Sequence, residues 1–272
     1  MIDPSGQDAE SYRDRLGLRG DVVRFEKGSL PVFAIGDELV LKLFPPEHHG
    51  EVPAEVAVME ALHGKLPVPT PRLHATGLLD DWAYVLMSRL HGEEPDVPDV
   101  ELSARVGEML KALHAVEPPA TLGPGDWAAF VAGQRKGCVE QQRKRGLGER
   151  WLERIPGFLD GVDLGAERPV LLHTEVMSGH LLRQNGKLSG LFDFEPAMRG
   201  AFEYEFVGVG IFVTKGDREC WKALVDAYGR VPEPRRVMAY TLLHVYSDMS
   251  WYLREMPEGD SFDELAVRWF GA

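Results

Sequence analysis

Residues 170–195, VLLHTEVMSGHLLRQNGKLSGLFDFE, place polar side chains directly after two short apolar runs. The runs at residues 170–172 and 188–192 are typical of buried strand ends. Asn185-Gly186 is a strong hairpin signal, so residues 181–183 and 187–191 are predicted to pair antiparallel. This pairing would bring His180 and Asp193 together at one end of the hairpin.

The composition is that of an ordinary globular protein, with 272 residues, 44% of them hydrophobic and 27% charged. This length suits one large domain or two lobes. The net charge of −13 argues against a nucleic-acid partner, which needs a basic face, and mildly favours a cationic ligand. A solubilising surface explains the charge equally well.

The features that report on the compartment favour the cytoplasm. Two cysteines cannot form a disulfide framework, which fits a reducing environment. The first residues carry neither a basic n-region nor an apolar h-region, so no signal peptide is expected. The apolar run at residues 206–213 is too short to span a bilayer, so no membrane partner is expected. The oligomeric state stays open.

The first third of the chain is rich in predicted strands, at residues 22–25, 31–35, 39–44, 73–78 and 82–87. Lys42 lies inside the apolar run 39–44, where most lysines point to solvent. An apolar-faced helix predicted at residues 53–63 can place Glu55 opposite Lys42, and Glu60 is the less favoured alternative.

Helical patterns take over after residue 88, at residues 101–116, 127–145, 203–213, 218–228 and 235–254. We therefore expect a lobe boundary there, with lobes at residues 1–88 and 89–272. In the last predicted helix, His244 and Asp248 share a face, and a packing pair explains them better than a metal site.

Kinases that use ATP carry the motif H-x-D-x-x-x-x-N followed by D-F-G. In this sequence the corresponding positions, in order, hold His173, Glu175, His180, Asp193 and Glu195. On these residues the chain resembles the aminoglycoside phosphotransferase and choline kinase superfamily. Residues 64–69, GKLPVP, also look like the end of the N-lobe helix in aminoglycoside kinases. The resemblance implies an α+β, two-lobed, protein-kinase-like fold. An antiparallel-sheet N-lobe with one main helix would precede a mainly helical C-lobe.

The resemblance also implies roles for individual residues. Lys42 would hold the phosphates of ATP and be oriented by Glu55, while Asp193 and His180 would bind Mg²⁺. Glu175 would orient or deprotonate the acceptor hydroxyl. Mg²⁺ prefers oxygen ligands, which makes His180 an unusual ligand, but macrolide kinases of the superfamily carry histidine there.

Further positions follow from the same resemblance. Gly28 and Ser29 would form the flap over the phosphates, and the backbone from Ser88 to Leu90 would bind the adenine. The acceptor site is expected among acidic residues of the C-terminal helices, such as Asp248 and Glu255. Two more residues would support the catalytic loop, namely His173 as a structural residue and Glu205, in the position of a bracing aspartate.

The sequence therefore predicts an ATP- and Mg²⁺-dependent kinase that phosphorylates a hydroxyl of a small molecule. No A-P-E activation segment follows Asp193, which argues against a protein substrate. An aminoglycoside or another cationic, hydroxyl-rich compound is the first candidate, and macrolides and amino-alcohol metabolites stay open. The rival is a catalytically inactive nucleotide- or ligand-binding module, because Glu175 and His180 depart from the kinase motif.

Overall fold

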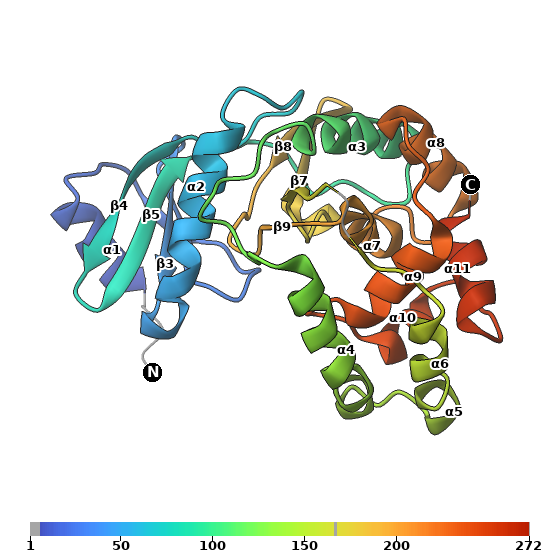
Figure 1. Ribbon diagram of the computed structural model, residues 1–272. Helices are drawn as coiled ribbons and strands as arrows, with labels where there is room; N and C mark the ends of the chain where they lie inside the picture. Colours follow the sequence, from blue (N-terminus) through green and yellow to red (C-terminus); the bar gives the residue numbers. More distant parts are fainter. Residues whose placement is uncertain (1–5, 166–167, 272) are drawn as a thin grey trace.

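A five-stranded antiparallel sheet forms the N-terminal lobe of the computed structural model, which describes residues 6–165 and 168–271 (Figure 1). Its strands lie in the order β1-β2-β3-β5-β4. Their bounds are β1 (Val22–Arg24), β2 (Val32–Ile35), β3 (Leu39–Phe44), β4 (Leu73–Leu79) and β5 (Trp82–Ser88). The predicted strands are thus confirmed to within one residue at nearly every end.

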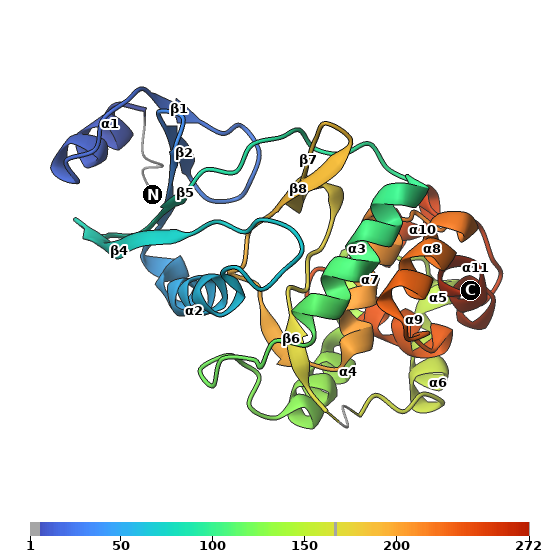
Figure 2. The same ribbon diagram turned by 90° about the horizontal axis from the view of Figure 1, so that it is seen from above.

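Helices cover the two faces of this sheet (Figure 2). Helix α1 (Gly6–Arg15) packs on one face, in a cluster that includes Leu41 and Leu43, and α2 (Val52–Leu62), which follows η1 (Pro46–Glu51), packs on the other. Because side chains alternate along a strand, Lys42 points to the opposite face from its neighbours, toward α2.

The C-terminal lobe is mainly helical, as predicted. Its helices are α3 (Val100–Leu113), α4 (Trp127–Lys144), α5 (Glu149–Leu152), α6 (Ile155–Asp160), α7 (Phe202–Phe212), α8 (Arg218–Tyr228), α9 (Pro234–Leu243), α10 (Met249–Glu255) and α11 (Phe262–Phe270). Helix α7 is buried almost all round, which is typical of a central core helix. The sheet of the other lobe ends at Ser88, and we propose the lobe boundary directly after it.

Two small antiparallel sheets carry the residues that the motif singled out. Strand β6 (Val170–Leu172) pairs with β9 (Met198–Gly200), and β7 (Leu181–Gln184) pairs with β8 (Lys187–Leu191) after the short helix η2 (Ser178–His180). The predicted hairpin is therefore confirmed, with Leu181 opposite Leu191.

The single helix predicted at residues 235–254 is wrong, because α9 ends at Leu243 and α10 begins at Met249. A buried side chain from α4 stabilises the break. The Gln142 amide donates to the carbonyl of Leu242 (3.2 Å) and accepts from the N–H of Met249 (3.1 Å). Asp248 then caps α10 by accepting from the N–H of Trp251.

The break also corrects the prediction that His244 and Asp248 share a helical face. The two residues lie at the ends of a loop that joins the two helices.

None of the helices in the described residues combines the length and the apolar character needed to cross a membrane.

Helices α3 and α8 approach closely at Gly107, so this position gives a stability test. A Cβ atom there would lie 2.2 Å from the carbonyl oxygen of Leu224. We expect Gly107→Ala to lower the free energy of unfolding by about 1–3 kcal/mol, as overpacking does, in urea denaturation. Gly133→Ala in α4 is the matched control, because a Cβ there meets nothing within 4 Å. It should stabilise by up to about 1 kcal/mol. Equal stability of the two variants would contradict the close approach.

Candidate active site

The Lys42 ammonium joins the two lobes. Its Nζ lies 3.3 Å from Glu55 Oε2 and 2.5 Å from Asp193 Oδ1, and it also contacts the Glu195 carboxylate. Lys42 is 4% exposed and Glu55 is 1% exposed. The Glu55 carboxylate also accepts the backbone N–H of Phe194. The sequence prediction that Lys42 and Glu55 lie together is therefore correct in geometry.

The ionisable groups around Lys42 differ in their pKa values and therefore in their charge at neutral pH. Burial disfavours the charged ammonium of Lys42, but Glu55, Asp193 and Glu195 outweigh it and raise the pKa of Lys42. Burial likewise opposes ionisation of Asp193, but Lys42 holds the pKa of Asp193 below its usual range. Burial, together with the charge of Asp193, raises the pKa of Glu195 to about 9. Asp193 therefore carries the negative charge, and Glu195 retains a proton near neutral pH.

The catalytic-loop candidates converge on the other side of Asp193. His180 Nε2 lies 3.2 Å from Asp193 Oδ2, and His180 Nδ1 donates to the backbone carbonyl of Glu175 at 2.8 Å. With Nδ1 donating to this carbonyl, Nε2 is the ring nitrogen that faces the Asp193 carboxylate. Burial raises the pKa of the Glu175 carboxyl group, which lies in the same group of side chains.

A buried carboxylate of α7 holds the start of the predicted catalytic loop. Glu205, on α7, accepts the backbone N–H of His173 at 2.6 Å. The His173 ring accepts the N–H of Glu175 at Nδ1 and donates from Nε2 to the carbonyl of Phe192. Burial lowers the pKa of His173, which fits this neutral tautomer. These contacts match the structural role expected of His173 and the bracing role expected of Glu205.

A strained residue sets the direction of the loop. Thr174 has φ +71°, a left-handed conformation that is costly for a β-branched side chain. Its hydroxyl donates to the carbonyl of Pro196, and its own carbonyl accepts from His244 Nε2 at 3.2 Å. His244 Nδ1 in turn accepts the N–H of Tyr246. One buried imidazole thus connects the catalytic loop to the loop between α9 and α10.

The residues predicted for the nucleotide side lie in the loop between β1 and β2 and directly after β5. Gly28, with φ +114°, and Ser29 are exposed in the loop between β1 and β2. At the hinge, the N–H of Ser88 donates to the carbonyl of Arg72, and the N–H of Arg89 donates to that of Glu38. Adjacent strands therefore occupy these two donors, which shifts the predicted adenine contact toward Leu90.

The acceptor-side predictions are less closely grouped. Asp248 and Glu255 lie at opposite ends of α10, and Glu255 is exposed. The Asp248 carboxylate accepts the N–H of Trp251, so its described contact is that of a helix cap. Tyr246, which the sequence analysis did not single out, is 53% exposed. Burial and the charge of Glu175 raise the pKa of Tyr246, so this residue borders the site. Its only signal was its place after His244.

The arrangement around His180 and Asp193 fits a divalent cation. Two adjacent ligands of an octahedral Mg²⁺ lie about 3 Å apart, close to the separation of these two side chains. Glu175, His180 and Asp193 each offer an atom within 4.8 Å of the others, and Glu55, Asp193 and Glu195 form a second such group. Glu195 is thus an additional oxygen donor that the sequence prediction left out.

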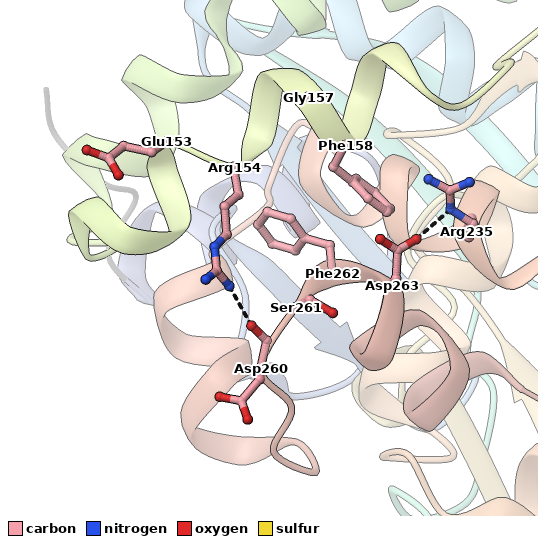
Figure 3. A pocket seen from close by; sticks show the side chains of 9 residues that line it. All are labelled: Glu153, Arg154, Gly157, Phe158, Arg235, Asp260, Ser261, Phe262 and Asp263. Atoms are coloured by element: carbon pink, nitrogen blue, oxygen red, sulfur yellow. Dashed lines mark hydrogen bonds and ion pairs between the residues drawn. The ribbon is translucent and has the colours of Figure 1, made fainter.

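A surface cavity of about 490 Å³ lies elsewhere, between α6, the start of α9 and the segment before α11 (Figure 3). The rings of Phe158 and Phe262 lie in the middle of this cavity. On either side, Arg154 donates to the carbonyl of Asp260 and Arg235 forms an ion pair with Asp263. Arg235 lies in the first turn of α9, about 14 Å along the helix from the end that touches the catalytic loop. None of the candidate catalytic side chains lines this cavity.

Comparison with known proteins now places the chain. The profile of the phosphotransferase enzyme family matches residues 21–240. The chain belongs to this family. The phosphotransferase is accordingly a small-molecule kinase, and its kinase-like α+β fold is the one that the sequence predicted.

Solved structures agree on the fold of this phosphotransferase. A GDP complex of an aminoglycoside 2′-phosphotransferase superposes with a TM-score of 0.72 at 16% identity, over 87% of this chain and 86% of that one. The macrolide 2′-phosphotransferase MphH from Brachybacterium faecium gives 0.72 at 18% identity, over 96% and 98%. A type I macrolide 2′-phosphotransferase gives 0.64 at 19% identity, over 100% and 99%. The similarity spans both lobes in each case.

The buried His244 gives a pH test of the loop connection. Burial lowers the pKa of His244 to about 4, below the 6.5 of an unfolded chain. As the pH falls, the unfolded state binds a proton at His244 before the folded state does. The contribution of His244 to the free energy of unfolding is therefore fully present above pH 6.5 and is lost as the pH drops toward 4. We expect His244 to account for roughly 3 kcal/mol of this fall.

The measurement is urea denaturation of the parent and of His244→Gln from pH 7 to pH 4. Glutamine keeps a donor and an acceptor but does not titrate, so the variant should lose less stability over this range. His63→Gln, which changes an exposed histidine at the end of α2, is the matched control. If the parent and His244→Gln lose stability equally, His244 is not buried in the neutral form.

Proposed function

We propose that this phosphotransferase transfers the γ-phosphoryl group of ATP, with Mg²⁺, to a hydroxyl group of a small molecule. One observation carries the proposal. The Lys42–Glu55 pair on the N-lobe meets Asp193, His180 and Glu175 on the C-lobe, so a phosphate-binding cation and a candidate base face one space.

Lys42 supports the nucleotide side of the proposal. A buried ammonium with three carboxylates around it is held in one place, and it can pass from Asp193 and Glu195 to the phosphates when they enter. Asp193 and His180 would hold Mg²⁺, which when bound supplies positive charge to the phosphate oxygens. Gly28 and Ser29 would cover the phosphates with backbone N–H groups.

Glu175 supports the acceptor side. Phosphoryl transfer needs a group that orients the attacking hydroxyl and takes its proton, and a carboxylate with a raised pKa suits this task. The net charge of −13 suits a cationic acceptor, for which Asp248 and Glu255, at the two ends of α10, would be the acidic contacts. An aminoglycoside-like compound is therefore our first candidate and a macrolide the second, since similar folds act on each.

The test follows ADP release from ATP and Mg²⁺ with a panel of hydroxylated acceptors that includes aminoglycosides, macrolides and amino alcohols. We expect ADP release that depends on the acceptor, with phosphate recovered on a hydroxyl of one of these compounds. If the protein binds ATP but releases no ADP with any acceptor, the inactive binding module becomes the better description.

Glu175 is expected to be required for turnover. Glu175→Gln keeps the shape but cannot accept a proton, so we expect a loss of about 10²–10⁴-fold in kcat with little change in ATP affinity. Glu175→Asp shortens the side chain, and a displacement near 1 Å can cost about 10²-fold. The measurements are steady-state kinetics and ATP titration. Parent-like turnover of Glu175→Gln would show that the proton leaves by another route.

Lys42 is expected to matter more for nucleotide use than for the fold. Lys42→Ala should lower turnover by about 10²–10³-fold, the usual effect of removing one group that stabilises developing charge. The melting temperature should fall less, because without the ammonium burial raises the pKa of Asp193, which can then take up a proton. Glu55→Gln should weaken ATP use in the same direction, whereas Glu60→Gln, on the exposed face of α2, should not. Retained turnover in Lys42→Ala would rule out the assignment.

A further inference from the structure

The segment after the hinge is fixed to the C-lobe hairpin. Glu93 and Arg183 exchange two backbone hydrogen bonds, at 2.9 and 2.8 Å, and Ser189 Oγ donates to the carbonyl of His91. Between them, Gly92 has φ +145°, and a Cβ there would meet Ser189 Oγ at 2.6 Å. Only glycine allows so close an approach, so the chain that follows leaves from a fixed point.

Glu94, two residues after Gly92, contacts two loops of the proposed site with its two carboxylate oxygens. Oε2 pairs with Lys27 Nζ at 2.5 Å, and Oε1 accepts from Ser178 Oγ at 3.0 Å. Lys27 directly precedes Gly28 at the tip of the flap, and Ser178 lies three residues after Glu175. The Lys27 hydrogen bond holds the pKa of Glu94 below its usual range, so the carboxylate stays charged at neutral pH.

We propose that Glu94 is a positioning residue that tethers the phosphate flap to the catalytic loop. The flap belongs to the N-lobe, whereas Glu94 and Ser178 belong to the C-lobe, so this carboxylate connects the two lobes. By holding the flap over this site, the tether orders its backbone N–H groups before ATP binds and favours binding. The inference rests on the proposed function, because it takes the flap as the phosphate cover.

The exposure of the partners sets the size of the effect. Lys27 is 87% exposed and the side chain of Glu94 is 41% exposed, so water and salt weaken the pair. An exposed ion pair of this kind changes an equilibrium by about twofold to fivefold. The opposite role predicts the opposite sign. If Glu94 only withholds Lys27 from the phosphates, then neutralising Glu94 should strengthen ATP binding.

The experiment compares Glu94→Gln with Glu93→Gln, the adjacent exposed acid, whose described contacts use its backbone. Glutamine at position 94 can still accept from Ser178 but cannot pair with Lys27. We expect the dissociation constant and the KM for ATP to rise about twofold to fivefold in Glu94→Gln at low salt, with kcat nearly unchanged. The difference from the parent should shrink as salt is raised. Glu93→Gln should bind ATP as the parent does.

A double-mutant cycle with Lys27→Met then assigns the effect to the pair. If Glu94 tethers the flap through Lys27, Lys27→Met alone should weaken ATP binding, and Glu94→Gln should have no further effect in the Lys27→Met background. Additive effects, tighter binding in Glu94→Gln, or equal binding in the Glu94 and Glu93 variants would each overturn the inference. A parent protein that binds no ATP at all would instead mean that the proposed function fails.

Discussion

The buried ammonium of Lys42 is the constraint on which the two lobes depend. A charge out of contact with water costs several kcal/mol unless it is paired, and the partners of Lys42 come from both parts of the chain. Glu55 belongs to α2, whereas Asp193 and Glu195 follow β8. Since Glu55 also accepts the N–H of Phe194, the helix is attached to the same segment by a neutral donor. The space between the lobes is therefore defined by electrostatics as well as by packing.

The catalytic loop depends in the same way on a carboxylate beneath it. Glu205 is fully buried on α7 and holds the start of the loop through the N–H of His173. Burial by itself would raise the pKa of Glu205, but His114 and the backbone N–H of His173 lower it, so the bond is charge-assisted. This hydrogen bond lies one residue before Thr174 and helps to offset the strained backbone there.

Much of this arrangement could be predicted from the sequence because it depends on local patterns of residues. The Asn-Gly turn before β8 specifies the hairpin within a few residues, whereas the apolar run around Lys42 alone would predict a lysine that faces solvent. The break between α9 and α10 was not accessible in this way. It depends on Gln142, about a hundred residues earlier in the chain, and the helical periodicity of residues 235–254 contains no sign of it. Glu195 was passed over for a similar reason, because only the fold shows that it reaches Lys42.

The contacts described for the loop between α9 and α10 have a common character, since they join neutral groups. The Gln142 amide, the Tyr204 hydroxyl that accepts the N–H of Val245, and the uncharged His244 ring hold it. The nucleotide side is held by ions. Changes in ionic strength therefore act on exposed ion pairs such as Lys27–Glu94 and spare the hydrogen bonds of this loop. Exposed side chains of the loop, such as Tyr246, can also be exchanged without altering the charge balance around Lys42. In the proposed kinase, selectivity for the acceptor and binding of the nucleotide would thus depend on different contacts, so that selection could change one without rebuilding the other.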